Sequence, residues 1–315
     1  MTIFSDLVGQ SQAITLLTQV LTHQRIAPAY LFTGPAGIGK RRTARQFAQA
    51  LLDGGDGPQP VGQFIPPDLL WVEPTYLHQG QRFTATEAET AGLKRRSPPQ
   101  IRLEQVRELT RFLSRSPLQA PRLVVVIEGA ELMAEAAANA LLKTLEEPGS
   151  ATLILLSDQS DRLLTTILSR CQQIPFRRLS QADMLTVLQR INAEALRERP
   201  DLLALAQGSP GQAIAALHQW ESLPEAVIAS LGQPPQTALQ ALTAAREITT
   251  LDIETQLWLI DYLQHRYYGE QAPQRQWVIN QQRLQQLEAA RDHLRRFVQP
   301  KLVWEVTLMA FAGAI

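Results

Sequence analysis

The sequence has few cysteines, no excess of charge of either sign and no long hydrophobic run. The single cysteine, Cys171, excludes an intramolecular disulfide and a metal site built mainly from cysteines. The 30 basic residues balance the 30 acidic ones. This balance argues against binding nucleic acid through bulk charge, although it does not exclude a local basic face. The most apolar stretch, 306–315, is shorter than the roughly 20 residues of a membrane span, and no signal peptide is visible. We therefore expect a cytoplasmic protein with no membrane partner.

The pattern of apolar residues divides the chain at about residue 178. With 315 residues, 45% of them hydrophobic, the chain is long enough for two or three globular domains. Before residue 178, helical patterns alternate with short apolar runs that are typical of buried parallel strands. Strands are predicted at 29–33, 68–73, 123–127, 152–156 and 172–176. After residue 178 the pattern is helical, so an α/β domain followed by helical domains is expected.

Two segments between the predicted strands carry loop signals. Residues 53–67 contain four glycines and four prolines, which predicts a surface loop. Residues 74–100 are polar and end near two prolines, so we expect an irregular insertion. The basic trio Lys94-Arg95-Arg96 in this insertion is interpreted as part of a solvated loop rather than as a DNA contact.

A glycine-rich loop separates the first predicted strand from a helical pattern. Its sequence is Gly34-Pro35-Ala36-Gly37-Ile38-Gly39-Lys40, which matches the first seven positions of the phosphate-binding loop. Glycines allow backbone N–H groups to surround phosphates, and the lysine reaches the terminal phosphates. The loop therefore predicts a site for the phosphates of ATP or ADP.

Two positions of this site depart from the pattern of a hydrolase. Arg41 stands where a Ser or Thr hydroxyl would bind Mg²⁺, and a guanidinium cannot replace that oxygen. The strand at 123–127 ends in Glu128 where an Asp is expected for the metal, and Gly129 follows where a Glu could activate water. We expect slow or absent hydrolysis and predict no metal site, while nucleotide binding to the altered site stays open.

Several further segments occur in an order that resembles one family. They are Val8-Gly9-Gln10, the glycine-rich loop, Pro67-Asp68-Leu69, residues 101–107, 128–133 and 139–148, Ser169-Arg170-Cys171 and Gly208-Ser209-Pro210-Gly211. Together they resemble the delta-prime subunits of the bacterial DNA polymerase III clamp loader, which belong to the AAA+ superfamily. The resemblance implies an AAA+ P-loop α/β domain with a parallel sheet at 1–177, a small helical lid at 178–232 and an all-α collar at 233–315.

The resemblance also assigns a role to Arg170. In this family the arginine of the Ser-Arg-Cys segment is an arginine finger, which enters the ATP site of a neighbouring motor subunit. A guanidinium supplied in trans can raise the rate of phosphoryl transfer about 10³–10⁵-fold. Ser169 would cap or orient this finger. The alternative is an arginine that caps the C-terminus of a short helix, where its charge suits the helix dipole. Cys171 is expected to pack as a small apolar residue.

The resemblance implies a largely non-hydrolysing subunit of the replisome. It would help to assemble the complex that loads the sliding clamp on primed DNA, as part of the DNA polymerase III holoenzyme near the nucleoid. Its partners would be motor subunits of the tau/gamma type and the delta subunit, with the clamp and DNA reached through the complex. Gly211 stands where active members carry a nucleotide-sensing arginine. The alternatives are a catalytically active AAA+ ATPase such as the motor subunit and, less favoured, a stand-alone nucleotide-dependent DNA-binding module.

One feature common in the family is absent from the sequence. Many members carry a four-cysteine zinc module before the Pro-Asp-Leu segment, but residues 53–66 contain neither Cys nor His. A structural zinc is therefore not supported.

Overall fold

The computed structural model describes residues 3–54, 66–93, 98–147, 149–232, 234–269 and 274–313. The chain divides into two compact units, Met1–Ala193 with Gly208–Gln212, and Glu194–Gln207 with Ala213–Ile315. The predicted domain boundaries after residues 177 and 232 stay predictions. Most of the predicted loop at 53–67, and the basic trio at 94–96, lie outside the described residues.

The first unit is built around a five-stranded parallel sheet with the order β2-β5-β6-β1-β7. Its strands are β1 (Ala29–Thr33), β2 (Leu69–Val72), β5 (Val124–Ile127), β6 (Thr152–Ser157) and β7 (Gln172–Pro175). The five strands predicted from apolar runs are therefore confirmed. β1 pairs with β6 on one side and with β7 on the other, so the loop that follows β1 begins near the middle of the sheet's edge.

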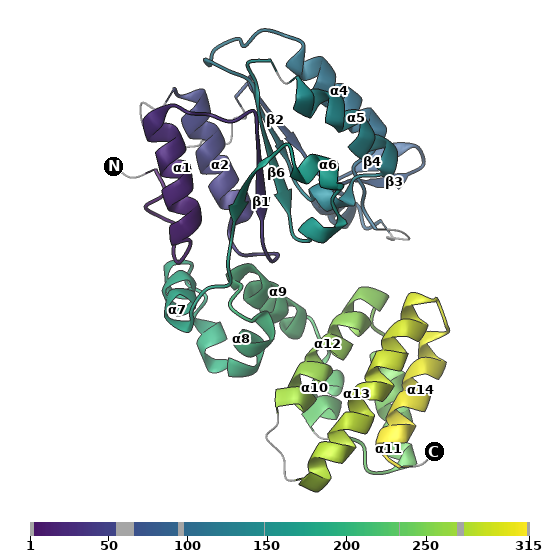
Figure 1. Ribbon diagram of the computed structural model, residues 1–315. Coiled ribbons are helices and arrows are strands. Elements are labelled where there is room, and N and C mark those ends of the chain that lie inside the picture. The colour runs from purple at the N-terminus through teal and green to yellow at the C-terminus, as the bar shows by residue number, and fades with distance from the viewer. Residues whose placement is uncertain are drawn as a thin grey trace. The chain divides into compact units, whose positions relative to one another are not determined.

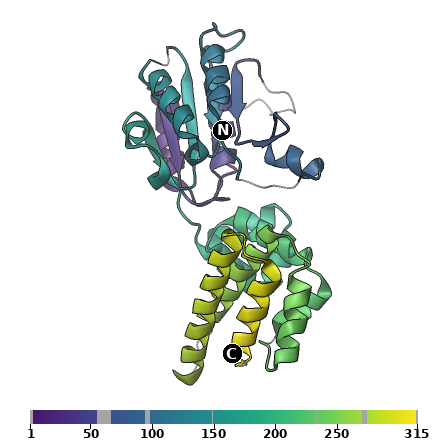
Figure 2. The same cartoon turned by 90° about the vertical axis from the view of Figure 1, so that its right-hand side faces the viewer.

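Helices cover both faces of this sheet (Figures 1 and 2). α1 (Ser11–His23) and α2 (Lys40–Leu52) cover one face, and α4 (Leu103–Leu113), α5 (Glu135–Glu146) and α6 (Thr165–Leu168) cover the other. Since side chains alternate along a strand, Tyr30 and Phe32 join the core with α1 and α2, whereas Leu31 joins the core with α4 and α5. Burial on both faces explains why strands such as β5 are apolar at every position.

The segment at 74–100 is more regular than predicted. β3 (Tyr76–His78) and β4 (Gln81–Phe83) form an antiparallel hairpin, in which Gln79 and Gly80 have φ of 49° and 81°. Two consecutive left-handed residues are what a two-residue hairpin turn requires. α3 (Ala85–Thr90) follows, and it begins with a capping box between Thr84 and Glu87. The prediction of an irregular insertion was therefore wrong, because these short polar elements are specified by a turn and a cap rather than by apolar periodicity.

The remaining described elements are helices, and those after residue 178 confirm the helical pattern predicted there. α7 (Gln181–Arg190) belongs to the first unit, together with the short 3₁₀ helices η1 (Ala130–Leu132) and η2 (Ser160–Arg162). The second unit contains η3 (Glu194–Glu198), α8 (Pro200–Ala206), most of α9 (Pro210–Glu221), α10 (Glu225–Gly232), α11 (Ala238–Ile248), α12 (Ile253–Gly269), α13 (Gln274–Arg295) and α14 (Pro300–Phe311). α14 packs against α11 and α13. Its Trp304 is fully buried, and the indole N–H donates to Gln256 Oε1 at 2.8 Å. Over the described ranges, no helix has the length and apolar character of a membrane span.

Candidate functional site

The glycine-rich loop connects β1 to α2 and is packed tightly on one side. Gly37 has φ of 72°, and a Cβ atom there would lie 2.8 Å from Gln212 N and 2.9 Å from Gly211 Cα. Both the left-handed backbone and this close approach require glycine. The segment at 208–212 therefore docks on the loop within the first unit, and this contact was not predicted from the sequence.

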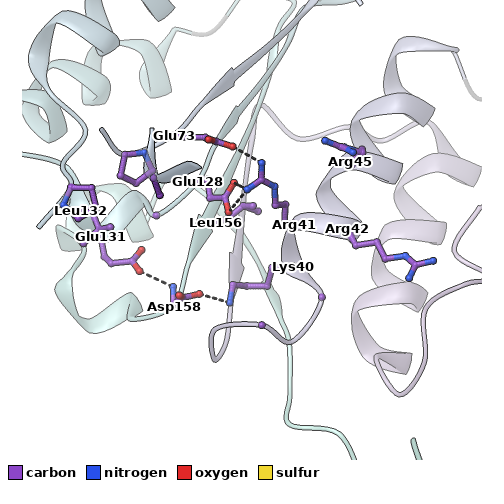
Figure 3. A pocket seen from close by; sticks show the side chains of 16 residues that line it. Lys40, Arg41, Arg42, Arg45, Glu73, Glu128, Glu131, Leu132, Leu156 and Asp158 are labelled. Atoms are coloured by element: carbon purple, nitrogen blue, oxygen red, sulfur yellow. Dashed lines mark hydrogen bonds and ion pairs between the residues drawn. The ribbon is translucent and has the colours of Figure 1, made fainter. Parts of the chain in front are cut away.

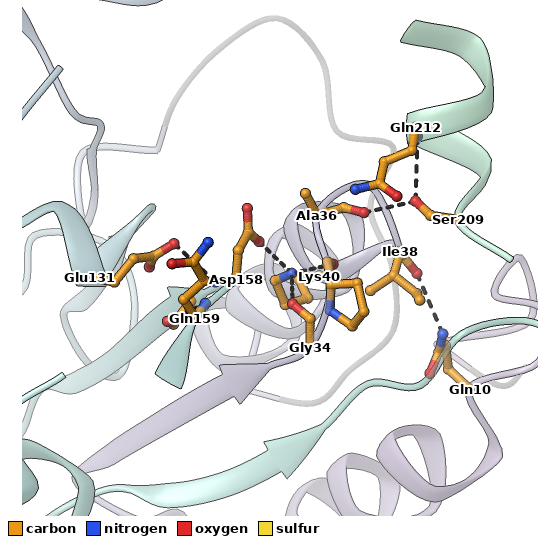
Figure 4. Close-up of polar contacts among 12 residues, drawn as sticks. Gln10, Gly34, Ala36, Ile38, Lys40, Glu131, Asp158, Gln159, Ser209 and Gln212 are labelled. Carbon is orange, nitrogen blue, oxygen red and sulfur yellow. Dashed lines mark hydrogen bonds and ion pairs between the residues drawn. The ribbon is translucent and has the colours of Figure 1, made fainter. Parts of the chain in front are cut away.

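The carbonyl oxygens of the loop, from Gly34 to Gly39, all accept hydrogen bonds within the unit. The donors are Lys40 Nζ to Gly34 and Pro35 (2.6 and 2.7 Å), Ser209 Oγ to Ala36 (2.7 Å), Gly211 N to Gly37 (3.0 Å), Gln10 Nε2 to Ile38 (3.5 Å) and Thr43 to Gly39 (3.0 Å). Figure 4 shows several of these contacts. By contrast, the backbone N–H groups of residues 36–42 donate to no acceptor among the described residues. The loop thus keeps its donors available for an anion.

Lys40 is buried and bonded within the site. Its side chain is 6% exposed, and Nζ lies 2.6 Å from Asp158 Oδ1 in addition to its two carbonyl contacts. An ammonium has three N–H donors, so each one has an acceptor. Asp158 follows β6, and its backbone N–H donates to Glu131 Oε1 at 3.1 Å. Sequence reasoning missed Asp158, although an acid directly after a buried strand at the loop's edge of the sheet was a usable signal.

Arg41 lies between two carboxylates (Figure 3). Its Nη2 bonds to Glu73 Oε1, and its Nη1 lies 3.1 Å from Glu128 Oε2. Trp71 Nε1 also donates to Glu128 Oε2, at 3.2 Å, and the Arg41 guanidinium carbon lies 5.5 Å from the centroid of the Trp71 ring. The structure therefore brings together Arg41 and Glu128, which were predicted, and adds Glu73, which was not. Glu73 follows β2 as Glu128 follows β5, and adjacent parallel strands end at the same edge.

These residues do not fit a divalent cation. Burial raises the pKa of the Glu128 carboxyl above its ordinary value, although Arg41 and Trp71 act in the opposite direction. Its oxygens already accept from these two side chains, and Arg41 offers no lone pair. Gly129, where a water activator was considered, has φ of 62°, and a Cβ there would lie 2.9 Å from Pro74 Cγ. Within the described part of the chain, no three His, Cys, Asp or Glu side chains are grouped to hold a metal ion.

A cleft of about 700 Å³ opens beside the loop. Its charged lining residues are Lys40, Arg41, Arg42, Arg45, Glu73, Glu128, Glu131 and Asp158, four basic and four acidic, so their formal charges sum to zero. The loop with its free N–H groups fits a chain of phosphates, whereas the carboxylates that would hold a metal are bound to Arg41.

The Ser169-Arg170-Cys171 segment lies elsewhere in the first unit, after α6. Ser169 Oγ and Arg170 Nη1 both donate to Thr166 O, at 3.1 and 3.0 Å, which is the capping contact considered as the alternative for Arg170. Arg170 Nη2 also bonds to Glu146 Oε1 at 2.6 Å, and the two side chains are 35% and 52% exposed. The finger role requires a neighbouring subunit and stays a prediction. Cys171 is buried, which raises its thiol pKa to about 11, so it packs as an apolar residue as expected.

This fold and site define the class of the protein, which is AAA+: a parallel sheet covered by helices, a phosphate loop after β1 and a helical C-terminal region. A gamma subunit-related protein of DNA polymerase III from Thermotoga maritima has a similar structure, with a TM-score of 0.52 over 96% of this chain and 99% of that one. The two sequences are 17% identical, so this likeness concerns the fold alone.

Family models identify the chain more closely. A model described as "DNA polymerase III, delta subunit" matches residues 9–180, and one described as "Cyanobacterial DNA polymerase III delta prime, C-terminal domain" matches residues 182–311. The chain belongs to the DNA polymerase III delta-prime family.

Two curated relatives show the extent of the similarity. The chain is 40% identical over 221 residues to DNA polymerase III subunit delta' of Pseudomonas aeruginosa. The aligned region covers 65% of this chain and 60% of that protein. It is 31% identical over 262 residues to subunit tau of Escherichia coli. Here the aligned region covers 82% of this chain and 37% of that protein. The chain therefore matches less than two thirds of the length of either relative.

Proposed function

We propose that this chain is a largely non-hydrolysing subunit of the bacterial replicative clamp loader. Membership of the delta-prime family supports a place in the clamp-loader complex. The direct partners there would be motor subunits of the tau/gamma type and a delta subunit. The complex would load the sliding clamp on primed DNA. One observation carries the non-hydrolysing role: Arg41 stands where the pattern has the metal-binding hydroxyl and binds both Glu73 and Glu128, two carboxylates that line the cleft.

We further propose that Arg170 acts as an arginine finger for the ATP site of the adjacent motor subunit. Its carboxylate partner, Glu146, is half exposed, and ion pairs of this kind contribute at most about 1 kcal/mol to stability. The guanidinium can therefore exchange Glu146 for the phosphate oxygens of a nucleotide on a neighbour at little cost. There it would offset the negative charge that develops during phosphoryl transfer.

The finger is tested by DNA-stimulated ATP hydrolysis in the reconstituted clamp loader. Arg170→Ala should lower hydrolysis at the adjacent motor subunit's site by about 10³-fold or more, so that the complex loses that site's share of the rate while the subunits still assemble. The matched control is Arg162→Ala, because Arg162 is an exposed arginine eight residues away on η2. Unchanged hydrolysis and clamp loading with Arg170→Ala would exclude the finger.

A second candidate is a catalytically active AAA+ ATPase like the motor subunit. It is favoured by Lys40, by the free N–H groups of residues 36–42 and by the similarity to subunit tau. Steady-state hydrolysis by the isolated chain separates the two candidates. Turnover near about 1 s⁻¹ that is removed by Lys40→Ala would support the ATPase, and turnover at background would support the non-hydrolysing subunit.

A further inference from the structure

We propose that the phosphate loop of this chain binds the phosphates of a nucleotide without a divalent cation, because the Arg41 guanidinium occupies the place between Glu73 and Glu128. This inference rests on the proposed function, because both assume that the chain does not hydrolyse ATP. A phosphate site that excludes the metal ion lacks the cation that hydrolysis uses. It does not depend on Arg170.

The donors for phosphate are present without a metal. Seven consecutive backbone N–H groups, those of residues 36–42, have no acceptor among the described residues, and they surround the start of the 13-residue helix α2. Lys40 is buried at the same place, and the cleft of about 700 Å³ lies beside it. These are separate features, a backbone concavity, a buried ammonium and a cavity, and each suits an anion.

The half-exposed Arg41 side chain makes three contacts at the position where the phosphate-loop pattern has a metal-binding hydroxyl. Arg41 bonds to Glu73 with one nitrogen and to Glu128 with the other, and it lies over the Trp71 ring. Trp71 also donates to Glu128, so this carboxylate is bound twice. A Mg²⁺ ion requires oxygen ligands in near-octahedral geometry and loses its water reluctantly. To use these carboxylates it would have to displace the guanidinium that already binds both of them.

The structure also explains why such binding would be weak. Asp158 lies 2.6 Å from Lys40 Nζ, so an incoming phosphate competes with this carboxylate for the ammonium. Asp158 is 44% exposed and can turn away from Lys40 when a ligand arrives. Asparagine has the same shape as aspartate without the charge, so it should compete less with phosphate for Lys40. Asp158→Asn should therefore tighten nucleotide binding by about tenfold or more.

The test is titration calorimetry of the full chain with ATP, in buffer that contains either EDTA or magnesium chloride. The expected result is binding in EDTA that added Mg²⁺ does not tighten by more than about threefold. Absence of binding in both buffers, or binding that appears only with Mg²⁺, would overturn the proposal. This comparison needs no variant, so it does not depend on whether a variant folds.

Two matched variants locate the effect. Arg41→Ser restores the hydroxyl and releases Glu73 and Glu128, so Mg²⁺ should then tighten ATP binding by about tenfold or more. Arg25→Ser removes the same charge from an exposed position outside the cleft and should behave as the wild type. Equal responses of the two variants to Mg²⁺ would refute the role of Arg41. Because Arg170 takes no part in these titrations, failure here is distinct from failure of the arginine-finger assay.

Discussion

The two edges of the parallel sheet hold their charged groups in different ways. At the carboxyl-terminal edge, Arg41 is bound by Glu73 and Glu128, which are only 27% and 28% exposed. At the amino-terminal edge, Arg170 precedes β7 and has one carboxylate partner, the half-exposed Glu146. Arg41, itself 54% exposed, is shared by two carboxylates, whereas Arg170 has a single, half-exposed carboxylate to exchange. The chain therefore neutralises the cations of its own cleft and leaves an exchangeable guanidinium at the opposite edge.

Asp68 extends this comparison to carboxylates. It precedes β2 at the amino-terminal edge, is 1% exposed, and accepts from the backbone N–H groups of Leu118, Gln119 and Ala120 at 2.7–2.8 Å. Backbone N–H groups hold Asp68, whereas the side chains of Arg41 and Trp71 hold Glu128. Three backbone donors around a buried carboxylate indicate a structural role for Asp68, whereas Glu128 lines the cleft and is bound by side chains.

The largest expected effect concerns the chemistry of Arg170. Arg170→Lys keeps the charge but loses the planar fork of donors, so DNA-stimulated ATP hydrolysis at the adjacent motor subunit's site should fall about 10³-fold, and the complex should lose that site's share of the rate. The measurement is the hydrolysis rate at saturating DNA, beside the wild type and Arg162→Ala. If lysine supported the full rate, a positive charge alone would suffice at position 170. The contrast between the guanidinium groups of Arg170 and Arg41 would then not explain the function of Arg170.

A large loss of stability is expected at Asp68. Asp68→Ala removes the acceptor of three backbone N–H groups, so the free energy of unfolding should fall by about 2–4 kcal/mol. Urea unfolding measures this loss. Asp161→Ala, which changes an exposed acid on η2, serves as the control. A change below about 0.5 kcal/mol at Asp68 would show that these bonds are not structural.

The pH dependence should have opposite signs at Asp68 and Glu128. Burial alone would raise the pKa of Asp68, but the three N–H groups and Arg115 lower it overall, so its stabilisation is lost as pH falls below about 4. The pKa of Glu128 is raised, chiefly by burial, so the folded chain binds its proton more tightly and the favourable contribution is lost as pH rises above about 4.

Urea unfolding as a function of pH checks these signs with Asp68→Asn and Glu128→Gln. The stability difference between wild type and Asp68→Asn should shrink as the solution is acidified. The difference for Glu128→Gln should change in the opposite direction over the same range. Parallel profiles for the two variants would contradict the distinction between the two edges.

The smallest effect is expected for Glu146→Ala. Since its ion pair with Arg170 is exposed, thermal unfolding should correspond to a loss of less than about 1 kcal/mol. A loss above about 2 kcal/mol would mean that Arg170 is held as firmly as Arg41.

Much of the fold was predictable because its signals are local. The apolar runs at 123–127 and 152–156 are strands in the structure, and the helical pattern after Lys40 is α2. The hairpin at β3 and β4 was missed, because its signal lies in the Gln79-Gly80 turn and not in hydrophobicity. For the site, the phosphate loop, Arg41 and Glu128 were identified in advance, whereas Glu73 and Asp158 were not.

By itself, the sequence determined the five strands of the parallel sheet, the helical region after residue 178, the glycine loop and the loss of the metal-binding hydroxyl at Arg41. These features depend on residue type and short-range spacing, which a single chain displays directly. Only the tertiary structure decided that Asp158 binds Lys40, that Glu73 and Glu128 share Arg41, and that Ser209 and Gly211 dock on the loop. These partners lie between 32 and 174 positions apart in the sequence, and the register of parallel strands brings most of them to one edge of the sheet.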